Sequence, residues 1–211
     1  LHNLVPVNYV QFIDNFEEQI SMIHESNNLL QMEYAYKQNP SVIIPRLIRC
    51  SESCLIMSYE SGDIMDKMEL SQYQRTKIIT LLYGFIMSNQ MFYDLLHNDI
   101  HKANWKVRQI DENKFAIVVY DFGFCYRKEP RDRPIITMMT DMFEAADVDK
   151  ATEDGADKYS KMMCFFCGDY SDHFREQTKE FIPDGIACDP NALFKLGIVV
   201  CDKTGATLNA N

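Results

Sequence analysis

Three side chains that can supply oxygen atoms to a metal ion lie near the middle of the sequence. Asp99 and Asn104 are five positions apart, and Asp121 follows after two short apolar runs. A carboxylate, an amide oxygen and a second carboxylate suit Mg²⁺, which completes its shell with water and phosphate. A carboxylate that stays off the metal can orient a hydroxyl group and accept its proton during phosphoryl transfer. These residues predict a magnesium-dependent site for phosphoryl transfer.

A hairpin is needed to bring these side chains together. The runs at 105–107 and 115–120 are apolar and rich in β-branched residues, and polar residues at 111–113 separate them. This pattern predicts two antiparallel strands joined by a polar turn. Asp99 and Asn104 precede the first strand and Asp121 follows the second, so the hairpin would return Asp121 to the rim where the other two lie.

Helices are predicted on both sides of the hairpin. Ser71 and Gln74 form a capping-box pattern, and apolar residues then recur at steps of three and four as far as Leu96. The same periodicity predicts a first helix over residues 8–38. The further expected elements are an antiparallel pair of strands at 42–44 and 55–57 with its turn at 49–53, helices over 136–146, 155–166 and 171–181, and a fraying end at 201–211.

The composition excludes several classes of protein. The chain has 211 residues, 46% of them hydrophobic, and a formal net charge of −10, which indicates a folded chain and argues against a nucleic-acid partner. The longest apolar run, 78–87, is too short to cross a bilayer, so no transmembrane segment is expected. Seven cysteines, an odd number, favour free thiols in a reducing intracellular compartment. Cys164 and Cys167 form a lone CxxC, for which buried thiols are favoured over a redox pair or half of a zinc site.

Two motifs in the central region occur in the order that kinases use. His97, Asp99 and Asn104 spell H-x-D-x-x-x-x-N, and Asp121 begins D-F-G. One predicted hairpin separates them, as in the catalytic and metal-binding loops of kinases.

The chain resembles the UbiB/ADCK family of atypical kinases (activity-of-bc-one type) over nearly its whole length. Four stretches carry the resemblance: Glu25-Ser-Asn-Asn28 resembles E-A-x-N, Val42 to Pro45 with Ser51-Glu-Ser resembles V-P-x-V … S-T, Leu55-Ile-Met57 with Gly62 resembles the V-L-x-M-E-x-x-x-G hinge, and residues 97–104 resemble H-x-D-x-H-P-G-N.

The resemblance implies an α+β, protein-kinase-like fold. Residues 1–62 would form a partial small N-lobe and hinge, and residues 63–211 a mainly helical C-lobe with a catalytic hairpin. It also implies binding of ATP and Mg²⁺, kinase or ATPase activity, and a link to coenzyme Q or lipid metabolism. The expected phosphate acceptor is a small molecule or lipid precursor rather than a protein. The resemblance implies peripheral membrane association in mitochondria, plastids or bacteria.

The resemblance also implies roles for individual residues. Asp99 would be the catalytic carboxylate, and Asn104 and Asp121 would hold Mg²⁺. Glu25 would pair with a strand lysine of the family. The residues expected beside the nucleotide are Met57 as gatekeeper, Ser58 to Glu60 through their backbone groups, and His101 near phosphate or a loop carbonyl, while His97 is expected to brace the loop.

Departures from the family pattern leave alternatives open. Gln19 and Ser21 stand where the family has acidic residues, Ser58 replaces the hinge Glu, and Lys102 with Ala103 replaces Pro-Gly. A phosphate loop and a strand lysine are not found before Glu25, so we expect an N-terminally truncated chain or a degenerate relative. The alternatives are a pseudokinase that serves as a binding or scaffold module, and a phosphotransferase of the aminoglycoside- or choline-kinase type.

Overall fold

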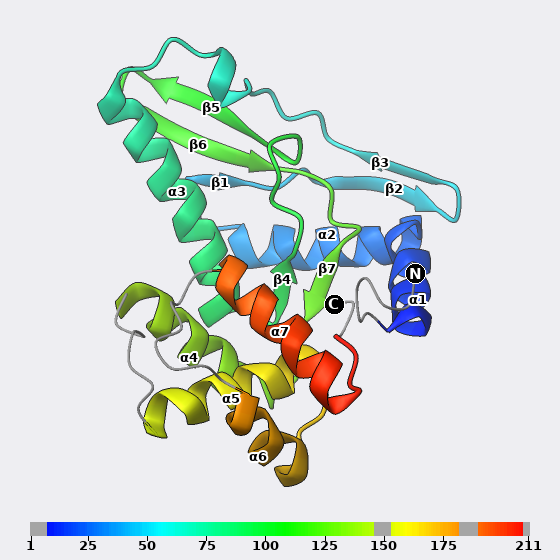
Figure 1. Ribbon diagram of the computed structural model, residues 1–211. Coiled ribbons are helices and arrows are strands. Elements are labelled where there is room, and N and C mark those ends of the chain that lie inside the picture. Colours follow the sequence, from blue (N-terminus) through cyan, green and yellow to red (C-terminus); the bar gives the residue numbers. More distant parts are fainter. Residues whose placement is uncertain (1–7, 146–152, 182–189, 209–211) are drawn as a thin grey trace. The chain divides into compact units, whose positions relative to one another are not determined.

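The computed structural model describes residues 8–145, 153–181 and 190–208 (Figure 1). The chain divides into two compact units, one of residues 16–128 and the other of residues 1–15 with 129–211. This division differs from the predicted boundary between lobes at residue 62, which stays a prediction.

The predicted first helix is two helices. Helix α1 covers Tyr9–Gln19 and helix α2 covers Met22–Tyr36. Ser21 lies between them in an extended conformation and caps α2, because its hydroxyl oxygen accepts a 3.2 Å hydrogen bond from the His24 backbone N–H. The apolar spacing continues through this break, and so the periodicity alone predicted one long helix.

The hairpin is confirmed, and a third strand joins it. Strand β5 (Trp105–Asp111) pairs antiparallel with β6 (Lys114–Val119), with Trp105 opposite Val119. On its other edge β6 pairs in parallel with β1 (Val42–Ile43), so the sheet order is β1-β6-β5.

The predicted pairing of residues 42–44 with 55–57 is wrong. Strand β2 (Leu47–Ser51) pairs antiparallel with β3 (Cys54–Met57), which leaves a turn of only two residues between them. Pro45 has no backbone N–H and separates β1 from β2, so the ladder with β3 begins after it.

Helix α3 (Gln72–Met91) begins at the predicted capping box. The Ser71 hydroxyl accepts a 3.3 Å bond from the Gln74 N–H, and the Gln74 side-chain oxygen accepts a 2.8 Å bond from the Ser71 N–H. The helix ends earlier than the prediction, because Leu96 belongs to β4 (Leu95–His97), which pairs antiparallel with β7 (Cys125–Arg127). The Lys128 ammonium group donates to the backbone oxygens of Asn89 and Gln90 and so satisfies carbonyl groups in the last turn of α3.

The main core of this unit lies between α2, α3 and the short sheets. Helix α2 contacts β1 to β4, and α3 contacts β4 and β6. A short 3₁₀ helix, η1 (Met65–Lys67), packs through Met65 against a second cluster between α3 and the hairpin. The buried residues of the main core are Leu29, Met32, Tyr36, Val42, Phe85, Leu95, Ile117, Val119 and Phe122.

The other unit is helical in the residues described. Helices α4 (Asp132–Ala145), α5 (Glu153–Cys167) and α6 (Asp172–Phe181) confirm three predicted helices, although residue 146 lies outside the described range. Helix α7 (Pro190–Thr204) was not predicted, and the expected fraying is wrong for residues 201–204, which are helical. Residues 209–211 lie outside the described range. The core between α5, α6 and α7 contains Tyr159, Met162, Met163, Cys164, Phe174, Leu196 and Val200.

No helix in the described part of the chain is both long enough and apolar enough to span a bilayer.

Candidate functional site

The loop from β4 to β5 is held together by Asn104. The Asn104 amide nitrogen donates to the backbone oxygen of Asp99 at 3.0 Å and to the Asp99 carboxylate at 3.2 Å. Because the nitrogen of this buried amide faces Asp99, its oxygen atom is turned away from that carboxylate. The Asn104 backbone oxygen accepts a 2.8 Å bond from the N–H of Tyr120, which ties the loop to the end of the hairpin.

Asp121 follows the hairpin in an unusual backbone conformation. Its φ is 58°, and among residues 8–145, 153–181 and 190–208 it is the only non-glycine residue with a positive φ. The exposed Asp121 carboxylate accepts a 3.3 Å bond from the Gly123 N–H. A left-handed conformation at a residue with a side chain costs energy, and such residues cluster at functional sites.

Helix α2 fixes the D-F-G segment from the other side. The Asn28 amide nitrogen donates to the Phe122 backbone oxygen at 2.9 Å, and the Phe122 side chain is fully buried. A Cβ on Gly123 would lie only 2.9 Å from the backbone oxygen of Gln19, so this close approach requires glycine.

Glu25 lies on α2 beside the same segment. Burial raises the pKa of the Glu25 carboxyl above its ordinary value, the negative charge of Asp121 raises it further, and a backbone hydrogen bond from Phe122 opposes both. The structure thus places Glu25 close to Asp121, while its pairing with a lysine stays a prediction.

His97 contacts both the loop between β4 and β5 and the end of the hairpin. Its Nε2 lies 3.0 Å from the Tyr120 backbone oxygen, and its Nδ1 accepts a 3.3 Å bond from the Asp99 N–H. The ring packs edge-on against Phe122, with centroids 5.4 Å apart. Burial is the main influence on the ring and lowers the pKa of His97, while the charges of Asp121 and Asp99 act in the opposite direction. Both carboxylates therefore lie near this ring.

The lowered pKa of His97 predicts an acid-sensitive fold. Above about pH 6.5 the ring is neutral in both states, but below it the unfolded chain binds a proton that the folded chain resists. The free energy of unfolding should therefore fall as the pH drops from 6.5 through the folded pKa, by at most about 1.4 kcal/mol per pH unit from this group. Urea unfolding at a series of pH values measures it.

His97→Gln should remove this part of the pH dependence, and His101→Gln, whose ring is exposed, should retain it. Equal slopes in His97→Gln and the wild type would contradict the assignment.

Residues 58–63, the hinge-like segment after β3, run beside the hairpin. Met57 packs against the main core, and the Ser58 N–H donates to the Arg46 backbone oxygen at 2.8 Å. The Glu60 backbone oxygen accepts a 2.6 Å bond from the Tyr120 hydroxyl. These two backbone groups thus have partners within the chain, and contacts of Met57, Ser58 and Glu60 with adenine stay predictions.

The Glu60 side chain fixes this segment to β5. Its carboxylate pairs with the Arg108 guanidinium at 2.8 Å. Burial acts to raise the pKa of Glu60, but hydrogen bonds from Arg108 and Ser58, together with the charges of Arg108 and Arg46, lower it overall. Asp63 and Val107 exchange two backbone hydrogen bonds of 2.8 Å. The segment is therefore secured along the hairpin by both side-chain and backbone contacts.

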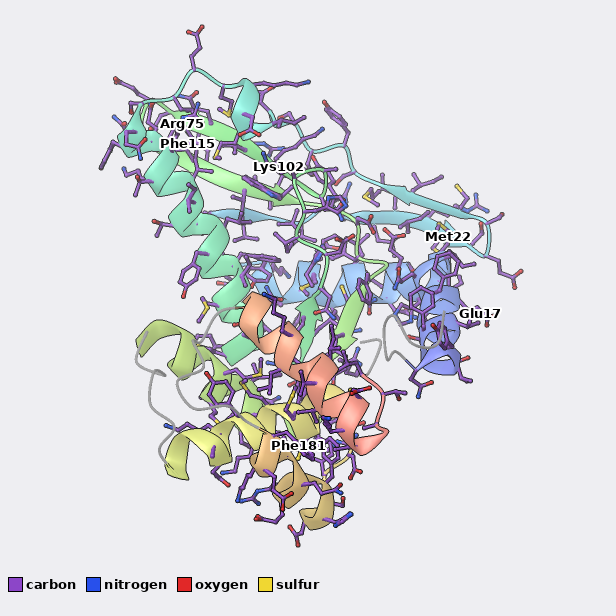
Figure 2. The ribbon with its side chains drawn as sticks, in the orientation of Figure 1. Glu17, Met22, Arg75, Lys102, Phe115 and Phe181 are labelled. Atoms are coloured by element: carbon purple, nitrogen blue, oxygen red, sulfur yellow. The ribbon has the colours of Figure 1, made fainter. Side chains whose placement is uncertain are left out.

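The two residues that follow Ile100 project from the same loop. His101 Nδ1 accepts a 3.1 Å bond from the Ala103 N–H, and its Nε2 lies 3.5 Å from an Asp99 carboxylate oxygen. The His101 ring therefore accepts a hydrogen bond from a backbone N–H instead of bonding to a loop carbonyl. A contact between His101 and phosphate stays a prediction. Lys102, labelled in Figure 2, pairs with Asp66 of η1 at 2.7 Å.

The structure adds three residues that sequence reasoning did not assign to the site. Asn28 holds Phe122, Tyr120 joins Asn104, His97 and Glu60, and Arg108 holds Glu60. Asn28 lies one helical turn after Glu25 within the matched E-A-x-N stretch, which was the available signal. No group of three or more His, Cys, Asp or Glu side chains that could hold a metal ion occurs in the described part of the chain.

Taken together, these helices and short sheets form a mixed α+β fold. It is a partial form of the protein-kinase-like fold. The family model of the ABC1 atypical kinase-like domain matches residues 6–154. The chain therefore belongs to this family of atypical kinases, which confirms the resemblance to UbiB/ADCK proteins. No match is found among curated proteins.

Proposed function

We propose that this protein is a magnesium- and ATP-dependent kinase or ATPase of the UbiB/ADCK type. The observation that carries the proposal is the orientation of Asn104, whose amide nitrogen donates twice to Asp99. The Asp99 carboxylate oxygen and the Asn104 amide oxygen can therefore have different roles. The Asp99 carboxylate is restrained for a catalytic role, while the Asn104 oxygen is directed elsewhere.

The donor set fits a magnesium ion that arrives with nucleotide. Asn104 offers an amide oxygen, and the exposed Asp121 carboxylate has one oxygen bonded to the Gly123 N–H. Two protein ligands are typical of Mg²⁺ sites in which phosphates and water supply the rest of the shell. When bound, the ion would neutralise charge on the transferring phosphate, and Asp99 would orient the acceptor hydroxyl or water.

The phosphate acceptor is proposed from family membership alone. We propose a small molecule or lipid precursor, with a link to coenzyme Q metabolism at a mitochondrial, plastid or bacterial membrane. The family match favours this reading over a phosphotransferase of the aminoglycoside- or choline-kinase type.

Nucleotide titration with and without Mg²⁺ tests the proposal. Isothermal titration of the full-length protein with ADP should give clearly tighter binding with Mg²⁺, because the phosphates complete the metal shell. Asp121→Asn should abolish most of this gain. Asp111→Asn, at the end of β5, keeps the oxygen that accepts from the Asn113 N–H and serves as the matched control. Equal ADP affinity with and without Mg²⁺, or tight Mg²⁺ binding without nucleotide, would refute the proposed metal site.

A binding or scaffold role is the second candidate. It is favoured by the hinge-like segment, because the Ser58 N–H and the Glu60 backbone oxygen are already engaged within the chain. Failure of the full-length protein to bind any adenine nucleotide would select this role.

A further inference from the structure

We propose that Cys167 and Cys201 form a reversible disulfide in the presence of a disulfide oxidant such as glutathione disulfide. The bond would link the end of α5 to the end of α7. This modification site lies in the C-terminal helical unit and does not depend on the proposed kinase activity.

The two sulfur atoms already lie close together. The Sγ atoms of Cys167 and Cys201 are 3.8 Å apart, although the two residues lie 34 positions apart in the sequence. Each cysteine lies in the last turn of its helix, and both helices belong to the same compact unit. Side-chain rotation can close such a gap towards the roughly 2.05 Å of a disulfide without moving either helix far.

The two thiols differ in exposure. Cys167 is partly exposed at the edge of the helical core, while Cys201 is 2% exposed. Cys167 is thus the sulfur that a dissolved oxidant reaches first. Cys201 can react only with a group already brought to it.

The order of reaction follows from this difference in exposure. The two thiols lie within reach of a weak S–H···S hydrogen bond, in which either sulfur can be the donor. Once Cys167 carries a glutathione group, Cys201 lies beside the mixed disulfide and is placed to attack it.

The exchange proceeds in two balanced steps. The Cys167 thiolate attacks one sulfur of glutathione disulfide, which forms a mixed disulfide and releases one glutathione thiolate. The Cys201 thiolate then attacks the Cys167 sulfur and displaces the second glutathione thiolate. Two protein thiols are oxidised, one glutathione disulfide is reduced to two glutathione molecules, and the two cysteine protons end on them.

The other cysteine of the CxxC is a poorer partner. Cys164 lies one turn earlier on α5 and packs in the core with 4% exposure, and burial raises the pKa of its thiol. The redox pair thus runs between two helices, not within the CxxC of the sequence.

Peptide mapping of the full-length protein tests this inference. The reduced protein is incubated with glutathione disulfide, alkylated and digested with trypsin, which yields peptides 162–175 and 196–203. We expect these peptides to be joined by a disulfide in the wild type, in Cys164→Ser and in the control Cys54→Ser, and to be separate in Cys201→Ser. The joined species should revert on addition of excess reduced glutathione.

A stability measurement supplies a second readout. Oxidation should raise the melting temperature of the wild type by about 5 °C or more, because the bond restricts the unfolded chain. Cys167→Ser, which alters a partly exposed site, should show no such rise. A glutathione adduct on Cys54 with no link between 162–175 and 196–203, or a link that Cys164→Ser abolishes, would overturn the inference.

Discussion

Replacing Asp99 by asparagine is expected to slow turnover by roughly 10²–10⁴-fold, the usual contribution of a general base. Asparagine keeps the size of the side chain and removes the charge that would orient the acceptor and accept its proton. Nucleotide affinity should change little, because Asp99 is proposed to stay off the metal. ATP turnover and nucleotide titration on the full-length protein measure the two quantities separately.

Asp121→Asn is the matched variant for this experiment. It removes the negative charge of a proposed metal ligand, so it should weaken binding of the magnesium nucleotide as well as turnover. A purely structural role for both residues would instead lower both melting temperatures and leave activity per folded molecule unchanged. Full activity of a stably folded Asp99→Asn protein would show that the loop between β4 and β5 is not catalytic.

Replacing Phe122 by alanine is expected to destabilise the fold by about 3–5 kcal/mol, the usual cost of removing a buried phenylalanine. Its ring is fully buried in the main core and lies edge-on to His97. The loss would include both the transfer of the ring to water and the cavity left beside His97. Urea or guanidinium denaturation of the full-length protein measures the change in free energy of unfolding.

Two further variants separate burial from side-chain size. Phe122→Leu fills most of the cavity and should cost clearly less than alanine. Phe92→Ala, at a side chain that is 72% exposed, should change stability by no more than about 0.5 kcal/mol. A cost below about 1 kcal/mol for Phe122→Ala would contradict the placement of this ring in the core.

Features determined by neighbouring residues could be predicted from the sequence. The capping box at Ser71 and Gln74 joins residues three apart, and the hairpin joins two strands through a short polar turn. The break at Ser21 was missed, because one capping hydroxyl interrupts a helix whose apolar spacing continues. The parallel pairing of β1 with β6 was missed because it joins residues that lie far apart in the sequence, such as Val42 and Ile117.

In the candidate site, too, local features could be predicted and contacts between distant residues could not. The spacing of Asp99, Asn104 and Asp121 around one hairpin predicts that they converge, and the structure confirms the hairpin and the contact between Asn104 and Asp99. Asn28 was not assigned a role because its partner, the Phe122 backbone oxygen, is 94 positions away in the sequence. Tyr120 was missed for a similar reason, since its hydroxyl bonds to Glu60, 60 positions earlier. Tertiary packing, not local pattern, determines these contacts.

The left-handed backbone at Asp121 bears on how a protein of this kind could lose its activity during evolution. Glycine and asparagine adopt this conformation more readily than most residues, and a β-branched residue adopts it very poorly. A descendant released from selection for metal binding could therefore accept glycine or asparagine at position 121 with little cost to folding. Inactive descendants should accumulate these two residues there, and valine or isoleucine should be rare even after the chemistry has been lost.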